Sequence, residues 1–402
     1  MLEKSGHRGL PALKFRLLGG LMRLMGRGQR WFAGDRLVPS GGDVKRIVAV
    51  HFGGIGDTVL TTPALVALAE HYGEARVSFI GSNLRHCSFL KNFPFVDEVK
   101  AFNIYSLDAR GLIRPFFWRA MSDVIADLNK KPIDLFVNFH SPYLIDWFFI
   151  EYLIVLLAGP RFSVGINPYF LTKESVYDRW VSEDDLEGKH DKDFFADIVE
   201  QMGIPVRKRE TVFPIAEEDR RFADTFIRSL RCRGEQLVCI HPGGTAAYSH
   251  WPVERYQSLT VELGRRGFSF LVIGAPNEAQ LAEAVSRDNP HAFNLAGKTT
   301  LTQSAALIER SALFIGNDSG PLHIAVAVGT PSVGLVGGGH SRFHLYAREN
   351  IRIIKKPVPC APCRNWNCPE KDCMYRIEVD DVIRAGEELL RGRMTGSRAE
   401  AR

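Results

Sequence analysis

The chain has 402 residues, 45% of them hydrophobic and 24% charged, which is typical of a globular protein with about two domains. The net charge is +5, yet residues 1–46 hold ten Lys or Arg against three acidic residues, so the rest of the chain is slightly acidic. Nucleic-acid binding needs a basic folded surface, and this distribution argues against it. The best candidate for a membrane span, residues 143–158, is too short and contains two acidic residues.

Residues 1–45 form a basic leader, in which residues 9–30 are predicted to be a helix. Leucines recur at helical spacing and arginines fall on the opposite face: Leu10, Leu13, Leu17, Leu21 and Leu24 against Arg16, Arg23, Arg27 and Arg30. Such a helix can lie on an anionic membrane surface. The alternatives are a disordered basic tail and a helix packed on the folded body. Arginines interrupt the apolar run, so a signal peptide is not predicted.

The first repeating pattern of strands and helices begins at residue 46. The apolar run 46–51 predicts a buried strand, and a glycine-rich turn with Gly54 and Gly56 leads into a helix over 58–71. Asp57 stands at the start of that helix, where on its own it is more typical of a helix cap than of catalysis. Further strands are predicted over 76–80, 96–101, 133–139 and 162–166, with a polar loop over 171–193.

The pattern restarts after residues 213–215, which marks a linker. Predicted strands over 237–241, 269–274 and 351–355 alternate with helices over 217–231, 251–267 and 379–391. The strand at 237–241 ends in a second glycine turn, 242–245.

The most informative stretch is 312–337, which reads as strand, turn, helix and strand. Ser319 is predicted to cap the helix, and Pro321 suits its first turn. Because the turn lies at the carboxyl end of a parallel strand and at the positive end of a helix, it favours a phosphate. Asp318 and His323 flank this opening, and the acidic Asp318 is better suited to a sugar hydroxyl.

Two consecutive doubly wound units predict an α/β fold with two facing Rossmann-like domains and a ligand cleft between them. The expected boundaries are 46–214 for the N-terminal acceptor domain and 215–359 for the C-terminal donor-binding domain. A cysteine-rich segment, 360–373, and a C-terminal helix and tail, 374–402, follow.

Four motifs in this order resemble glycosyltransferase family 9, the ADP-heptose:lipopolysaccharide heptosyltransferases: FGGIGDTVLTTPAL (52–65), HPGG with HWP (241–252), LAGKTTLTQSAALI (295–308) and GNDSGPLHIAVAVGTPSVGLVG (316–337). The resemblance implies a GT-B fold and an inverting, metal-independent glycosyltransferase without a cofactor. Its donor would be a nucleotide-diphosphate sugar, with heptose as the expected sugar. Its acceptor would be lipopolysaccharide core or another lipid-linked saccharide at the cytoplasmic face of the inner membrane.

The resemblance also assigns roles to residues. Asp57 would be the general base that deprotonates the acceptor hydroxyl, with Gly54 and Gly56 on the acceptor side. The expected donor-binding residues are Gly244, Thr245, Glu278, Gly297, Lys298, Asp318, Ser319, Gly320 and His323. Glu278 matches a position that approaches the ribose. The family usually has a lysine two residues before the Trp-Pro pair, and here that residue is Ser249. Either His250, Lys298 or a residue of the other domain replaces its charge, or the donor differs from ADP-heptose.

Four cysteines, Cys360, Cys363, Cys368 and Cys373, have a spacing that suits a tetrahedral zinc site. The alternative is a set of reduced structural thiols, or disulfides formed on oxidation.

Two other functions fit the same scaffold. A sugar-nucleotide epimerase or hydrolase would need no acceptor pocket, and a non-catalytic nucleotide-sugar-binding homologue would have lost its chemistry.

Overall fold

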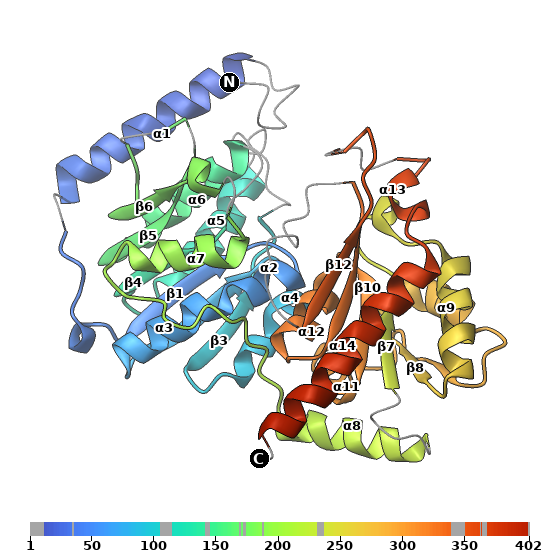
Figure 1. Ribbon diagram of the computed structural model, residues 1–402. Helices are drawn as coiled ribbons and strands as arrows, with labels where there is room; N and C mark the ends of the chain where they lie inside the picture. The colour runs from blue at the N-terminus through green and yellow to red at the C-terminus, as the bar shows by residue number, and fades with distance from the viewer. Residues whose placement is uncertain are drawn as a thin grey trace. The chain divides into compact units, whose positions relative to one another are not determined.

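The computed structural model describes residues 12–33, 36–104, 115–140, 145–168, 170–171, 174–186, 189–230, 237–338, 350–361, 363 and 368–400. The chain divides into two compact units, Met1–Glu210 and Thr211–Arg402, and each is described by itself. Each unit contains one six-stranded sheet, and all the strand pairs found in the described residues are parallel (Figure 1). The predicted α/β class with two doubly wound sheets is confirmed.

The sheet of the first unit has the order β3-β2-β1-β4-β5-β6. Its strands are β1 (Arg46–His51), β2 (Arg76–Gly81), β3 (Val96–Ala101), β4 (Leu135–Asn138), β5 (Phe162–Asn167) and β6 (Arg179–Ser182). The helices of the unit are α1 (Ala12–Ala33), α2 (Ile55–Leu60), α3 (Thr62–Tyr72), α4 (Leu84–Cys87), α5 (Pro115–Leu128), α6 (Ile145–Ala158) and α7 (Asp191–Glu200). Helices α2 and α3 pack with α7, while α1 and α5 pack with α6, so both faces of the sheet are covered.

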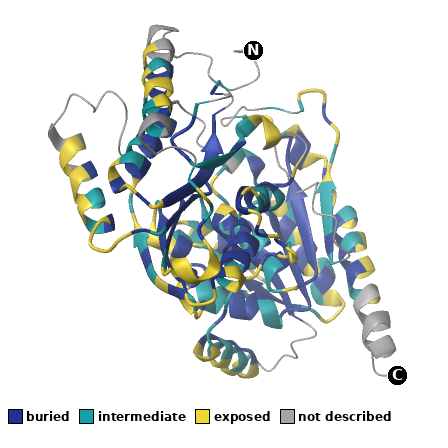
Figure 2. Ribbon diagram, turned by 90° about the vertical axis from the view of Figure 1, so that its left-hand side faces the viewer, coloured by how far each residue is buried: buried dark blue, intermediate teal, exposed yellow. Residues whose placement is uncertain are grey.

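The sheet of the second unit has the order β12-β11-β10-β7-β8-β9. Its strands are β7 (Leu237–His241), β8 (Ser269–Val272), β9 (Ala292–Asn294), β10 (Leu313–Asn317), β11 (Ser332–Val336) and β12 (Ile351–Lys355). Its helices are α8 (Glu217–Ser229), α9 (Val253–Arg265), α10 (Ala279–Ser286), α11 (Leu301–Arg310), α12 (Gly320–Ala327), α13 (Asp372–Tyr375) and α14 (Val379–Glu400). Strands β7, β10 and β11 are buried along their whole length, as Figure 2 shows in dark blue for the sheet interiors.

Each sheet has one place where the order of its strands reverses. In the first unit the chain builds β1, β2 and β3 toward one edge and then returns to place β4 on the other side of β1. In the second unit β10 returns to the free side of β7 in the same way. The loops that follow two such neighbouring strands diverge to opposite faces and open a crevice at the carboxyl edge of the sheet. The fold therefore predicts ligand sites after β1 and β4, and after β7 and β10.

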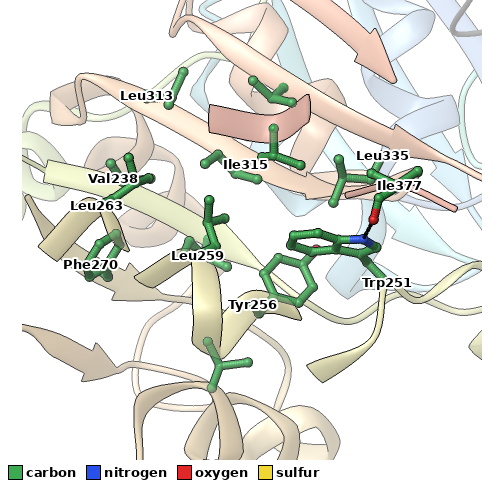
Figure 3. Close-up of a cluster of buried hydrophobic side chains, with 14 of the residues drawn as sticks. Val238, Trp251, Tyr256, Leu259, Leu263, Phe270, Leu313, Ile315, Leu335 and Ile377 are labelled. Carbon is green, nitrogen blue, oxygen red and sulfur yellow. Dashed lines mark hydrogen bonds between the residues drawn. The ribbon is translucent and has the colours of Figure 1, made fainter. Parts of the chain in front are cut away.

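The core of the second unit includes a tryptophan that joins distant segments. Trp251 is fully buried and stacks edge-on against Tyr256, with ring centroids 4.8 Å apart. Its indole Nε1 donates a hydrogen bond of 2.9 Å to the carbonyl of Ile377 (Figure 3). Residues after the cysteine-rich segment are thereby fixed to the start of α9.

Helix α1 packs on the first unit through a face other than the leucine stripe that was predicted from the sequence. Leu18 and Met22 are buried in the core cluster that includes α6, and a methyl group at Gly26 would lie 2.8 Å from the backbone nitrogen of Ser175. The described leucines of the predicted apolar stripe instead face solvent: Leu17, Leu21 and Leu24 are 60%, 46% and 64% exposed. The alternative of a helix packed on the body is thus confirmed for the described part. Leu10, and the side chains of Leu13, Arg16 and Arg30, lie outside the described residues.

Several predicted elements differ in the structure. The single helix expected over 58–71 is two helices, α2 and α3, which meet at Thr61. The polar loop expected over 171–193 contains β6 and the start of α7; β6 is a short edge strand, so its side chains are only partly buried and its apolar signal is weak. Within the described ranges, none of the helices combines the length and hydrophobicity that a bilayer crossing requires.

Candidate functional site

A buried asparagine organises the crevice of the second unit. Asn317, the last residue of β10, accepts hydrogen bonds from the Trp251 backbone nitrogen and the Tyr256 hydroxyl, both at 3.1 Å. Its amide nitrogen donates to the carbonyls of Pro242 at 2.6 Å and Gly243 at 3.1 Å. All the polar capacity of this side chain is used to hold the glycine turn after β7 against the end of β10.

A chain of side chains then links the loops after β7, β8 and β10. His241 Nδ1 lies 3.0 Å from the Ser319 hydroxyl, and its Nε2 lies 3.3 Å from Glu278 Oε2. The Glu278 carboxylate also accepts the backbone N–H groups of Gly244 at 2.8 Å and Ala275 at 2.7 Å. Because a carboxylate only accepts, His241 donates from Nε2.

The environment of Glu278 keeps its carboxyl ionised. Burial is the largest single influence and would raise its pKa, but the hydrogen bond and charge of His241 and the N–H groups of Ala275 and Gly244 all act in the opposite direction. Together they lower the pKa of Glu278 to about 2. The predicted donor site therefore contains a fixed negative charge.

Two glycines make this close approach possible. A methyl group at Gly243 would lie 2.0 Å from Glu278 Oε1, so no larger residue fits there. Gly244 has a φ of +142°, a conformation that side chains rarely adopt. The turn after β7 thus needs glycine for both packing and backbone conformation.

Ser319 does not cap α12 as the sequence predicted. Its side chain makes no capping hydrogen bond; the hydroxyl instead donates to the Asn317 carbonyl at 3.1 Å and pairs with His241. The first turn of α12 therefore has no side-chain cap within the described residues, which suits an external anion at this end of the helix. Gly320 is the first residue of this helix, and Asp318 and His323 are half-buried beside its start.

The remaining predicted donor residues lie on neighbouring loops. Thr245 is exposed. Gly297 has a φ of +74° and packs against Pro276 in the loop that carries Glu278. Lys298 directs its ammonium group to the carbonyl of Asn294 at 2.9 Å, and no contact in the described residues joins it to Ser319 or Glu278.

In the first unit, Asp57 lies in the first turn of α2 after β1. Asp57 is exposed, and its Oδ2 accepts the backbone N–H of Gly54 at 2.8 Å, so the helix-capping role is present. A methyl group at Gly53 would lie 2.5 Å from His51 Nε2 and 2.7 Å from Asp57 Oδ2. Gly56 is buried beside them. The turn thus presents one carboxylate at the carboxyl edge of the sheet, next to an imidazole.

His51 is neutral near pH 7. Burial is the main reason that its pKa falls to about 4; the Asp57 carboxylate opposes this shift, and His140 adds to it. Its Nδ1 donates to the Phe139 carbonyl at 3.1 Å, while its Nε2 is buried without a hydrogen-bond partner in the described residues.

A buried polar cluster lies beneath the end of β4. Asn138 donates to Glu151 Oε2 at 2.8 Å and lies 2.7 Å from the Tyr177 hydroxyl, and the His140 ring pairs with the Glu151 carboxylate. Glu151 is only 2% exposed, and partners of this kind are what allow a carboxyl group to be buried. These hydrogen bonds explain how α6, whose sequence is otherwise very apolar, can contain the acidic residue Glu151.

Sequence reasoning missed the roles of His241 and Asn317. Each is a polar residue at the last position of a strand that is buried along its whole length. A polar residue at the end of an apolar run is the signal in the sequence that could have identified them.

The four clustered cysteines do not converge. Cys360 is exposed, Cys363 and Cys368 are half-buried, and Cys373 is buried, all as free thiols. Across the described ranges no three His, Cys, Asp or Glu side chains gather as metal ligands, so the zinc prediction finds no support there.

Comparison with known proteins assigns a family to this arrangement. The model of glycosyltransferase family 9 (heptosyltransferase) matches residues 172–374, about half of the chain. The protein therefore belongs to glycosyltransferase family 9 and is a glycosyltransferase.

Individual relatives agree with that assignment. Lipopolysaccharide heptosyltransferase 3 of Escherichia coli (strain K12) is 24% identical over 345 residues, which cover 83% of this chain and 95% of that protein. The glycosyltransferase family 9 structure from Veillonella parvula has a TM-score of 0.66 at 22% identity, covering 87% of this chain and 99% of that one. E. coli heptosyltransferase WaaC with ADP has a TM-score of 0.64 at 15% identity, covering 86% and 99%. These structures show that the fold is GT-B.

Proposed function

We propose that this glycosyltransferase moves a heptose from ADP-heptose to lipopolysaccharide core or another lipid-linked acceptor, with inversion at the anomeric carbon and without a metal. The observation that carries the proposal is family membership combined with likeness to a lipopolysaccharide heptosyltransferase along 95% of that relative's length. The ADP in the related WaaC structure supports the choice of nucleotide.

The second unit holds the donor in this proposal. The diphosphate lies at the uncapped start of α12 and beside the turn at Gly244 and Thr245, where backbone N–H groups and the helix dipole stabilise negative charge. The same groups stabilise the charge that develops on ADP as it leaves. Asp318, His323, Gly297 and Lys298 line the donor side.

Asp57 of the first unit is the general base. As the acceptor oxygen attacks the anomeric carbon from the face opposite the diphosphate, its proton passes to the Asp57 carboxylate, and the sugar–phosphate bond breaks. A general base must be accessible to the acceptor hydroxyl. The Asp57 carboxylate is exposed, and the Gly54 N–H fixes its orientation through Oδ2, so it meets this requirement. Gly54 and Gly56 keep the acceptor side of the turn open.

Helix α1 binds the membrane surface that carries the acceptor. Its exposed leucines lie, on helical spacing, between the face packed on the body and the face with Arg23 and Arg27, both exposed. Apolar side chains flanked by arginines suit the interface of an anionic bilayer. We place the enzyme at the cytoplasmic face of the inner membrane in this proposal.

An Asp57→Asn variant tests the catalytic assignment. The amide oxygen can still accept the Gly54 N–H, so folding and ADP binding should be unchanged, whereas the side chain can no longer take a proton. We expect transfer to fall about a thousandfold in an assay of heptose addition. The matched control is Asp97→Asn, an exposed carboxylate on β3, which should retain activity. An Asp57→Asn enzyme with normal activity would remove Asp57 from the mechanism.

A further inference from the structure

The donor site of the second unit contains two carboxylates, one of which is paired with His241. Glu278 is an ionised carboxylate there, and Asp318 lies at the start of α12. A nucleotide diphosphate brings further negative charges, and a phosphate binds most strongly where a cationic donor also reaches it. Because His241 is engaged by Glu278, a further cationic side chain at this site would strengthen the binding of a diphosphate.

The basic residues suggested by the sequence do not supply this charge. Lys298 is held at the carbonyl of Asn294, 2.9 Å away. His250 donates from Nε2 to the carbonyl of Gly244 at 2.9 Å. Burial lowers the pKa of His250, against the effect of that hydrogen bond, so the ring is neutral near pH 7. Ser249 is buried, with its hydroxyl bonded to the carbonyl of Ala246 at 2.8 Å.

A lysine from the end of the cysteine-rich segment lies next to this loop. Lys371 immediately precedes α13, and it is among the charged groups near enough to His250 to influence that ring. It is half-buried, and its ammonium group has no hydrogen bond or ion pair in the described residues. Its φ of +49° is one that side chains rarely adopt.

Fixed contacts hold the segment of Lys371 at the carboxyl edge of the sheet. The Trp251 indole binds the carbonyl of Ile377 at 2.9 Å (Figure 3). Arg255 donates to the carbonyl of Tyr375 at 3.2 Å. On the other side, Cys373 packs against Gly337, which follows β11; a methyl group there would lie 3.3 Å from its sulfur. Lys371 is therefore anchored between the loop before α9 and the end of β11.

We propose that Lys371 is the cationic residue that binds the donor diphosphate, an assignment that rests on the proposed function of the second unit. The lysine reaches the diphosphate from the cysteine-rich segment and takes the place of the charge that Ser249 lacks. The contacts of Trp251, Arg255 and Cys373 are the means by which that segment positions it.

Binding of ADP, AMP and adenosine by calorimetry tests the proposal. Lys371→Gln removes the charge of the side chain and keeps a polar group on a slightly shorter chain. We expect the dissociation constant for ADP to rise about tenfold, since a hydrogen bond to a charged group is lost. The effect should be smaller for AMP and absent for adenosine, and it should shrink at high salt. Lys371→Arg should bind ADP almost as the wild type does.

Two further variants separate charge from structure. Adding Ser249→Lys to Lys371→Gln returns a cation to the same loop and should recover most of the ADP affinity. Arg265→Ala removes a positive charge at the end of α9 and should leave binding unchanged. Equal ADP affinity of the wild type and Lys371→Gln, or no recovery in the double variant, would overturn the assignment of Lys371. A wild-type protein that does not bind ADP would instead contradict the proposed function, and the inference with it.

Discussion

The linked side chains His241, Glu278 and Ser319 unite three loops that are far apart in the sequence. The carboxylate of Glu278 accepts two backbone N–H groups and one imidazole N–H. Gly243 has no side chain, which leaves the space that this carboxylate requires. Since Asn317 fixes the same turn from below, the loops are held in place before any donor binds. If the diphosphate binds here as proposed, such preorganisation reduces the entropy lost when it is ordered.

The low pKa of Glu278 predicts a pH-dependent contribution to stability. Its carboxyl group has a pKa of about 2 in the folded protein and an ordinary value near 4.5 when unfolded. The depressed folded value means that the contribution is complete above pH 5 and is lost as the pH falls toward 2. We expect the wild type to lose about 2 kcal/mol more than Glu278→Gln between pH 6 and pH 3. Urea unfolding of both proteins at each pH measures this difference, and parallel curves would contradict the assigned contacts.

Single residues were predictable from sequence only where the local pattern specifies them. The glycines after β1 and β7, and Asp57 at the start of α2, were predictable because each stands where an apolar strand is followed by a turn and a helix. The contact between His241 and Glu278 spans 37 residues, and the contact between Asn138 and Tyr177 spans 39. No local pattern specifies either pair, because each depends on which strands become neighbours. The predicted capping role of Ser319 was wrong for the same reason, because its hydroxyl pairs with His241 at the end of another strand.

At the scale of elements, α1 combines a packed face with an exposed leucine stripe. Burial of Leu18 and Met22 fixes the helix to the body, which leaves the leucine stripe and two arginines at the surface. A helix needed only for packing would gain nothing from exposed leucines.

Replacing the exposed leucines tests whether α1 binds membranes. The triple variant Leu17→Ser, Leu21→Ser and Leu24→Ser touches no core residue and should fold normally. Each leucine is about half exposed, so each should contribute about 1 kcal/mol of transfer free energy on insertion. We expect binding to vesicles with anionic lipid to fall about a hundredfold in flotation experiments. Val261→Ser on α9, also an exposed position, is the control; unchanged flotation of the triple variant would exclude this role for α1.

Elements with strong apolar runs were predicted correctly, and the edge strands only in part: β3 and β12 have their expected bounds, whereas β6 was not expected. The buried strands β1, β7, β10 and β11 lie within a residue of the bounds expected from the sequence, which are 46–51, 237–241, 313–316 and 332–336, because both faces of these strands are covered. The edge strand β6 and the first turn of α7 were read as loop, since a half-exposed strand carries a mixed pattern. Tertiary packing, and not local preference, decides such segments.

At the scale of the whole molecule, two units repeat one topology and carry different chemistry. Each has its strand order reversed at the centre, and each presents polar side chains at that point: Asp57 and His51 in the first unit, and His241 and Asn317 in the second. In the proposed function the first provides the carboxylate that accepts a proton and the second the site for the diphosphate, which are the two requirements of glycosyl transfer from a nucleotide diphosphate. An epimerase or hydrolase would use the donor site alone.

Release of ADP from ADP-heptose, measured with and without a lipid-linked core acceptor, tests the central claim most directly. The account predicts that the wild-type enzyme releases ADP only when the acceptor is present, and that mass spectrometry finds the acceptor extended by one heptose. Turnover of ADP-heptose without any acceptor would contradict the account and indicate an epimerase or hydrolase. Binding of ADP with no transfer to any core acceptor would equally contradict it.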